Sequence, residues 1–272
     1  MIKIVQSISL ILLLCVTSGV SADKKLIRLA VVNTPYQSGL LDFLLKDFES
    51  QSGYRVSVYS GEKVFEQARR AKADMVIAHY GKPPMQDFVL EGYGSWPQMV
   101  FANQQVIIGP KSDPASIRGM TRASAALKQI AEKRQAFVIN QISGVNALFE
   151  LLWQQAGTPD KSGWFIDKGV AKGQAMKAAD QLQAYTLWGA IPFLKFSQKH
   201  DPDLAILVSA DPVLQRVMAI SLVNGDKVNG VNEAGAKALR DYLLSASVQA
   251  RISEFRQPEY DGQLWWPAAR HN

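Results

Sequence analysis

The sequence predicts an α/β protein made of two lobes that are joined by two crossing strands. Strand and helix patterns alternate from residue 26 onward, which is typical of a parallel sheet with helical crossovers. The segment 100–110 contains the apolar run Val106-Ile107-Ile108 and is expected to leave the first lobe as a strand. The apolar segment 217–223 is expected to bring the chain back. Two crossing strands form a hinge, which suits closure on a ligand.

The first five elements alternate strictly between strand and helix. Residues 26–32 have strand patterning, and residues 38–49 have helical spacing. The apolar face of that helix consists of Leu40, Leu41, Leu44, Leu45 and Phe48. A strand at 54–59, a helix at 64–72 and a strand at 74–79 follow. The last strand is apolar enough to lie inside a parallel sheet.

The remaining segments continue the mixture of helices and strands. Apolar periodicity predicts helices at 124–135, 146–155, 173–181, 234–245 and 247–254. Short apolar runs predict strands at 136–140, 184–187, 204–209 and 217–223. We expect residues 23–108 together with 217–272 to form the first lobe and residues 109–216 to form the second. The pattern leaves open a single continuous α/β domain with one wide sheet.

The first 22 residues have the composition of a secretory signal peptide. Lys3 supplies a positive charge, residues 8–16 form an apolar stretch too short to span a bilayer, and Val20-Ser21-Ala22 is a small-residue cleavage site. We expect a periplasmic chain that starts at Asp23. Cleavage removes Cys15, the only cysteine, so the mature protein has no disulfide. The alternatives are a buried first strand and an uncleaved anchor.

Composition and motifs give little support to catalysis or to nucleic-acid binding. The formal net charge is +6, and the basic residues are scattered rather than gathered in a nucleic-acid footprint. His79, His200 and His271 are dispersed, without the spacing of metal ligands. Neither a Gly-x-Ser-x-Gly elbow nor a P-loop is present. We therefore expect a protein that is not an enzyme and has no cofactor, metal or nucleic-acid partner. His79 is either a structural histidine or one that faces a cleft.

Small and polar residues follow four of the predicted strands, at 33–39, 59–62, 140–144 and 185–186. Ligands of open α/β sheets bind outside the carboxyl ends of the strands, where helix N-termini attract anions. The predicted ligand-binding residues are Asn33, Thr34, Ser60, Asn140, Ser143 and Thr186, with Tyr185 as a wall. Ser60 and Ser143 could alternatively be ordinary N-caps.

Several longer segments form a distinctive set: Ser38-Gly39-Leu40-Leu41-Asp42, the segments 73–79 and 88–94, and Val106-Ile107-Ile108-Gly109-Pro110. Together they resemble the tungstate-binding proteins of ABC transporters, within the phosphate-type periplasmic binding proteins. The resemblance implies a two-lobed periplasmic-binding-protein fold with two hinge strands. It also implies a periplasmic location, delivery of a ligand to a membrane permease, and ligand contacts from the four loops above.

The same loops depart from the family's pattern. Where the family carries an arginine, this chain has Asn140, and Trp188-Gly189 stand where the family has aspartate and arginine. A guanidinium makes bidentate, charge-assisted bonds to an oxyanion, and each such bond is worth about 1.5–3 kcal/mol. Neutral donors and helix N-termini remain for an anion. An uncharged solute that stacks on Tyr36 or Trp188 is the alternative.

The combined interpretation is a monomeric periplasmic solute-binding protein. We expect it to capture a small ligand, an oxyanion such as tungstate or molybdate, for an ABC transporter. One alternative is a periplasmic sensor that docks onto a membrane signalling protein. Another is a binding protein for a small molecule that is not an oxyanion.

Overall fold

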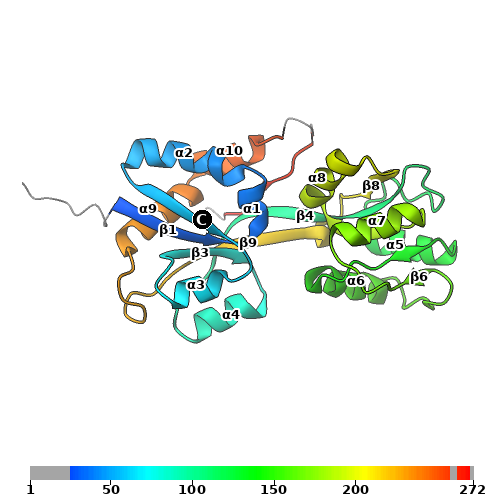
Figure 1. Ribbon diagram of the computed structural model, residues 1–272, viewed down its shortest axis with the longest axis horizontal. Coiled ribbons are helices and arrows are strands. Elements are labelled where there is room, and N and C mark those ends of the chain that lie inside the picture. Colours follow the sequence, from blue (N-terminus) through cyan, green and yellow to red (C-terminus); the bar gives the residue numbers. More distant parts are fainter. Residues whose placement is uncertain (1–24, 258–261, 270–272) are drawn as a thin grey trace, which may run out of the picture.

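The structure, a computed structural model, describes residues 25–257 and 262–269. Figure 1 shows two groups of helices and strands that are connected by β4 (Gln98–Pro110) and β9 (Gln215–Leu222). The mixed α/β class is thereby confirmed. The expected lobe boundaries, after residues 108 and 216, fall inside these two strands. The predicted signal peptide and the start of the mature chain lie outside the described residues.

The first group is built on a mixed sheet with the strand order β10-β4-β9-β3-β1-β2. Its parallel strands are β1 (Leu26–Val31), β2 (Arg55–Ser60) and β3 (Met75–His79). β9 is antiparallel to β3 and to β4, and β10 (Trp266–Pro267) is antiparallel to β4. Because β1, β2 and β3 are parallel, their last residues lie at the same edge of the sheet.

Six helices accompany this sheet (Figure 1): α1 (Asn33–Gln37), α2 (Leu40–Ser52), α3 (Val64–Arg69), α4 (Pro83–Leu90), α9 (Glu233–Leu244) and α10 (Ala246–Glu254). The predicted apolar face of α2 is buried at every position, which removes its leucines and Phe48 from water. The helix ends at Gly53, whose φ of +69° is the left-handed value that commonly follows a helix.

The second group is built around the later residues of β4. β7 (Thr186–Gly189) and β8 (Leu204–Val208) both pair antiparallel with that part of β4. β5 (Phe137–Val138) and β6 (Phe165–Ile166) form a separate parallel pair. The helices are α5 (Ala123–Glu132), α6 (Ser143–Gln155), α7 (Gly173–Gln181) and α8 (Ala190–His200), with a 3-10 turn η2 (Pro212–Leu214).

The two groups share a continuous apolar core along β4. Val106 and Ile108 of β4 belong to the same buried cluster as Ile27 and Leu44 of the first group and Met176 of the second. Burial on both sides holds the connecting strand in place, because each buried aliphatic side chain contributes roughly 1.5–3 kcal/mol. Among the described helices, none is long and apolar enough to cross a membrane.

The observed elements differ from the predicted ones where proline starts a helix. α4 begins with Pro83 and Pro84, and α8 has Pro192 as its third residue, and neither helix was predicted. Proline is compatible with the first turn of a helix, because the N–H groups there have no intrahelical partner. The short helix α1 likewise occupies part of the loop predicted at 33–39, with Pro35 as its third residue.

Two predicted strands also changed length or place. The strand predicted at 136–140 is reduced to the two residues of β5. The strand predicted at 184–187 is displaced to Thr186–Gly189, because Tyr185 forms a bridge with Phe137 instead of joining β7.

Candidate functional site

The two groups of elements meet at the edge of the sheet where the parallel strands end. Lys172 Nζ of the second group lies 3.5 Å from Glu62 Oε1 of the first. Lys195 Nζ, also of the second group, donates to the backbone carbonyl of Gln37. In open α/β sheets this edge is where ligands bind. The region between the two groups at this edge is therefore the candidate site.

Three predicted site residues lie on the first group's side of this edge. Ser60, the last residue of β2, donates through Oγ to Asn33 Oδ1, 3.2 Å away. The N–H of Gly61 donates to the carbonyl of Val31 over 3.0 Å, which holds the loop against the end of β1. Thr34 is partly buried, and its side chain has no hydrogen bond to a described residue. The structure thus brings Asn33 and Ser60 into contact.

Asn140 lies on the second group's side and is completely buried. Its Oδ1 accepts a hydrogen bond of 2.8 Å from the N–H of Lys172, the residue that pairs with Glu62 across the edge. Its Nδ2 is buried without a hydrogen-bond partner among the described residues. A buried amide donor without a partner costs free energy, so this group is available to a ligand or to a water molecule.

Ser143 is the first residue of α6 and is exposed. The carbonyl of Ile142 accepts the N–H groups of Val145 and Asn146, at 2.8 and 2.9 Å. No side chain caps the helix, and the N–H groups of Ser143 and Gly144 donate to no described residue. These two donors carry the partial positive charge of a helix N-terminus.

The structure corrects the expected role of Tyr185 as a wall of the site. Its ring is buried in the core of the second group, against Gly109 and Leu207. Its hydroxyl donates to Asp113 Oδ1 over 2.8 Å and accepts the N–H of Ala115 over 2.7 Å. Burial is the main cause that raises the pKa of the Tyr185 hydroxyl. This side chain supports the loop after β4.

Thr186, which follows Tyr185, is also fully buried. Its Oγ1 has no hydrogen-bond partner among the described residues. Thr186 pairs with Ile108 of β4 through the backbone, so the strand positions it rigidly. Like Asn140, Thr186 has a buried polar side-chain atom without a hydrogen-bond partner among the described residues.

A cavity of about 320 Å³ lies between the end of β3, the N-terminal half of α6 and the start of β9. Its basic residues are His79, Lys82 and Arg216, and no aspartate or glutamate lines it. The remaining lining residues are Tyr80, Gln105, Gly144, Ala147, Leu148, Leu151, Val213, Leu214, Gln215 and Val217. We call this the basic cavity. Two positive charges, those of Lys82 and Arg216, without a lining carboxylate favour an anion.

Arg216 extends from β9 to the N-terminus of α6. A Cβ atom at Gly144 would lie only 2.9 Å from Arg216 Nη1 and 3.1 Å from Nη2, so the guanidinium rests directly on this glycine. Gln105 Nε2 donates to the carbonyl of the same glycine over 3.4 Å. The guanidinium itself makes no ion pair or hydrogen bond with a described residue. Desolvation lowers the pKa of Arg216.

His79 is the second buried base of the cavity. Burial, and after it the charges of Arg216 and Lys82, lower its pKa from 6.5 to about 3. Its Nδ1 is buried without a hydrogen-bond partner among the described residues. The imidazole is therefore neutral at pH 7 and lies in a positive field. His79 lines the basic cavity, and its role there stays a prediction.

Sequence reasoning missed Arg216, Lys82 and Gln105. The available signal was the position of Arg216, immediately before the apolar segment 217–223 that was expected to cross between the lobes. A strand that passes between two lobes exposes its first residues to the cleft, so a lone arginine there points to a charged ligand.

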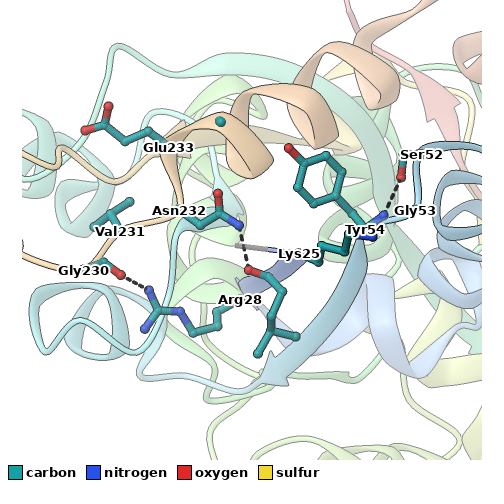
Figure 2. A pocket seen from close by; sticks show the side chains of 11 residues that line it. Lys25, Arg28, Ser52, Gly53, Tyr54, Gly230, Val231, Asn232 and Glu233 are labelled. Atoms are coloured by element: carbon teal, nitrogen blue, oxygen red, sulfur yellow. Dashed lines mark hydrogen bonds between the residues drawn. The ribbon is translucent and has the colours of Figure 1, made fainter. Parts of the chain in front are cut away.

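A larger cavity lies elsewhere and does not have the features of an anion site. It measures about 840 Å³ and is lined by residues at the starts of β1 and β2, including Lys25, Arg28 and Tyr54 (Figure 2). This is the end of the sheet opposite to the candidate site. Size alone is a poor guide here, because Arg28 and Asn232, two of the polar residues that line this cavity, already form hydrogen bonds within the fold.

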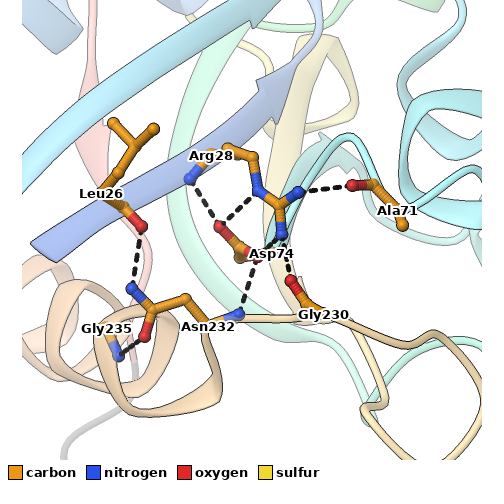
Figure 3. Close-up of polar contacts among 7 residues, drawn as sticks. All are labelled: Leu26, Arg28, Ala71, Asp74, Gly230, Asn232 and Gly235. Atoms are coloured by element: carbon orange, nitrogen blue, oxygen red, sulfur yellow. Dashed lines mark hydrogen bonds and ion pairs between the residues drawn. The ribbon is translucent and has the colours of Figure 1, made fainter. Parts of the chain in front are cut away.

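Figure 3 shows those polar contacts. The buried carboxylate of Asp74 accepts the N–H and Nε of Arg28 at 2.7 and 3.1 Å, and the N–H of Asn232 at 2.9 Å. Arg28 Nη2 also donates to the carbonyl of Gly230 over 2.7 Å. Asn232 in turn caps α9 by accepting the N–H of Gly235 over 3.0 Å. These bonds connect β1 to β3 and to the start of α9, so they stabilise the fold.

Comparison with known proteins assigns the chain to a family. It is 31% identical to the tungstate-binding protein TupA of Peptoclostridium acidaminophilum over 249 residues, 89% of this chain and 86% of that protein. It is 31% identical to a putative ABC transporter anion-binding protein of Haloferax volcanii, over 93% of this chain and 74% of that protein.

Solved structures agree with the sequence relatives. The tungstate-binding protein TupA of Desulfovibrio alaskensis G20 superposes with a TM-score of 0.79 and 26% identity, over 90% of this chain and 99% of that chain. No protein-family model matches the chain. Two relatives above 30% identity over most of the chain, together with the same fold, show that this protein belongs to the family of tungstate-binding and anion-binding proteins of ABC transporters.

Proposed function

We propose that this protein captures a small oxyanion, such as tungstate or molybdate, in the cleft between its two groups of elements. It then delivers the anion to the membrane permease of an ABC transporter. The observation that carries the proposal is the 31% identity, over 89% of the chain, to a protein named for tungstate binding. The second relative is named for anion binding. The basic cavity supports an anionic ligand.

Hydrogen-bond donors at the cleft edge supply the rest of the proposed site. Asn33 and Ser60 contribute from the first group. Asn140, Ser143 and Thr186 contribute from the second, with a free amide, a helix N-terminus and a free hydroxyl, respectively. Thr34 lies next to Asn33 on α1. Hydroxyl, amide and backbone N–H donors suit an oxyanion, because every oxygen of the anion is an acceptor.

The proposal includes an export step and a two-lobe mechanism. The signal peptide, residues 1–22, directs the chain to the periplasm and is removed there. Residues 23–108 with 217–272, and residues 109–216, act as the two lobes, and β4 and β9 are the hinge. Lys172 and Glu62 are drawn together when the lobes close, which supports a closed ligand-bound state.

Isothermal titration calorimetry of residues 23–272 tests the ligand. We expect heat of binding with tungstate or molybdate, and a higher unfolding midpoint in their presence, because a ligand that binds the folded state stabilises it by mass action. Sulfate and phosphate are the competing oxyanions. Binding of an amino acid or a neutral solute, with none of the four oxyanions bound, would overturn the proposed ligand class.

A further inference from the structure

We infer that Arg216, on the connecting strand β9, is the cationic ligand-binding residue of this protein and clamps the anion against the N-terminus of α6. The inference rests on the proposed oxyanion-binding function and names a residue that determines its affinity. Asn140 brings no charge to the site, and Arg216 provides the charge from another strand. Three observations on the described residues support it.

The first observation is that Arg216 has no partner although its position is partly buried. Five described arginines are neither exposed nor fully buried, and four of them pair with a carboxylate. These four pairs are Arg28 with Asp74, Arg69 with Glu91, Arg240 with Asp241 and Arg251 with Asp47. Arg216 forms no such pair with any described residue. A desolvated guanidinium is unfavourable until a negative group joins it.

The second observation is the position of the guanidinium. It rests on Gly144, where a Cβ atom would come within 2.9 Å of Nη1. The adjoining N–H groups of Ser143 and Gly144 donate to no described residue. The positive charge of Arg216 and the partial positive charge of the α6 N-terminus therefore lie together beside Gly144. An anion placed there would satisfy both at once.

The third observation is the surroundings of this region. Lys82 is the other positively charged residue of the basic cavity, and the cavity has no carboxylate to offset the charges of Lys82 and Arg216. Leu148, Leu151 and Leu214 also line the cavity. Apolar neighbours lower the local dielectric constant, which strengthens the attraction between a guanidinium and a bound anion.

Calorimetric titration of tungstate and molybdate into wild type, Arg216→Gln and Arg216→Lys tests the inference. We expect Arg216→Gln to weaken binding roughly ten- to hundredfold, which is the loss of a charge-assisted pair. Arg216→Lys should bind less tightly than wild type, because a point charge cannot make both bonds of the guanidinium. The unfolding midpoint of ligand-free Arg216→Gln should not fall, because the removed charge had no partner.

Arg55→Gln is the matched control. It removes the same charge from the start of β2, at the other end of the sheet, where the Arg55 side chain is 80% exposed. Its affinity should equal that of wild type. Equal weakening in Arg55→Gln and Arg216→Gln would overturn the inference, because the effect would then come from net charge.

The outcomes separate this inference from the proposed function. Wild-type binding with unaltered affinity in Arg216→Gln overturns the role of Arg216 and leaves the function in place. A wild-type protein that binds none of tungstate, molybdate, sulfate and phosphate overturns both. Should Arg216→Gln fail to fold, Arg216→Lys decides, and wild-type affinity in that variant overturns the inference.

Discussion

The fold opposes protonation of the His79 side chain. Its pKa is lowered from 6.5 to about 3, first by burial and then by Arg216 and Lys82. The folded protein therefore keeps the imidazole neutral at pH values where the unfolded chain protonates it. Between pH 6.5 and about 3 the unfolded state binds more protons, so lowering the pH through this window destabilises the fold.

This effect predicts a pH-dependent difference between wild type and His79→Gln. Below pH 6.5, the free energy of unfolding should fall more steeply with decreasing pH for wild type than for the variant. The difference between the two slopes should be up to about 1.4 kcal/mol per pH unit. Urea denaturation at several pH values between 7 and 4.5 measures both curves. Parallel curves for wild type and His79→Gln would contradict the prediction.

At the scale of single residues, the candidate site was predicted best where a polar residue directly follows a strand. Asn33 and Ser60 do meet, because the parallel strands β1 and β2 end side by side. Tyr185 was predicted to line the site, but its side chain is buried in the core, because alternation along a short strand does not show which face meets the core. Its hydroxyl instead satisfies Asp113 and the N–H of Ala115.

At the scale of elements, the carboxylate of Asp74 joins three parts of the first group. Asp74 itself lies immediately before β3. Its carboxylate binds Arg28 of β1 and the N–H of Asn232, which precedes α9 (Figure 3). Asp74 is fully buried, and the Arg28 side chain is 30% exposed. Removing one partner of such a pair leaves the other charge and two backbone donors without their acceptor.

We expect Asp74→Ala to destabilise the protein by about 3–5 kcal/mol, the usual cost of breaking a buried pair. The affinity for the anion should be unchanged, because this network lies at the end of the sheet opposite to the cleft. Urea denaturation and calorimetric titration measure the two effects separately.

Glu91→Ala is the control for this variant, because the carboxylate of the Glu91–Arg69 pair is exposed rather than buried, with side-chain exposures of 51% for Glu91 and 32% for Arg69. An exposed ion pair contributes at most about 1 kcal/mol. Equal destabilisation by Asp74→Ala and Glu91→Ala would show that burial does not set the strength of the Asp74 network.

The elements themselves were predictable wherever apolar residues repeat over a long segment. The apolar face of α2 was recognised from its spacing, and α7 was predicted with its observed bounds. α4 and α8 were not predicted, and each carries proline in its first turn. The first turn of a helix tolerates proline, because its N–H groups have no intrahelical partner.

At the scale of the whole molecule, the sequence predicts export and a fold without disulfides. Cleavage after Ala22 removes Cys15, the only cysteine of the chain. Mass spectrometry of the exported protein should give the mass of residues 23–272. The unfolding midpoint should be the same with and without a thiol reductant, because no disulfide constrains the unfolded state. A mature chain that retains residues 1–22, or a midpoint that reductant lowers, would contradict this prediction.

The sequence by itself determined the fold class, most helices and strands, and the family, because periodicity and local motifs are properties of neighbouring residues. Only the tertiary structure decided which polar groups meet. Arg216, His79 and Gly144 are far apart along the chain, and they come together because β3 and β9 pair while α6 packs across the cleft from them. Burial then leaves the guanidinium of Arg216 without a partner among the described residues. The lack of a partner for this guanidinium results from packing between residues far apart in the sequence, which no local sequence pattern predicts.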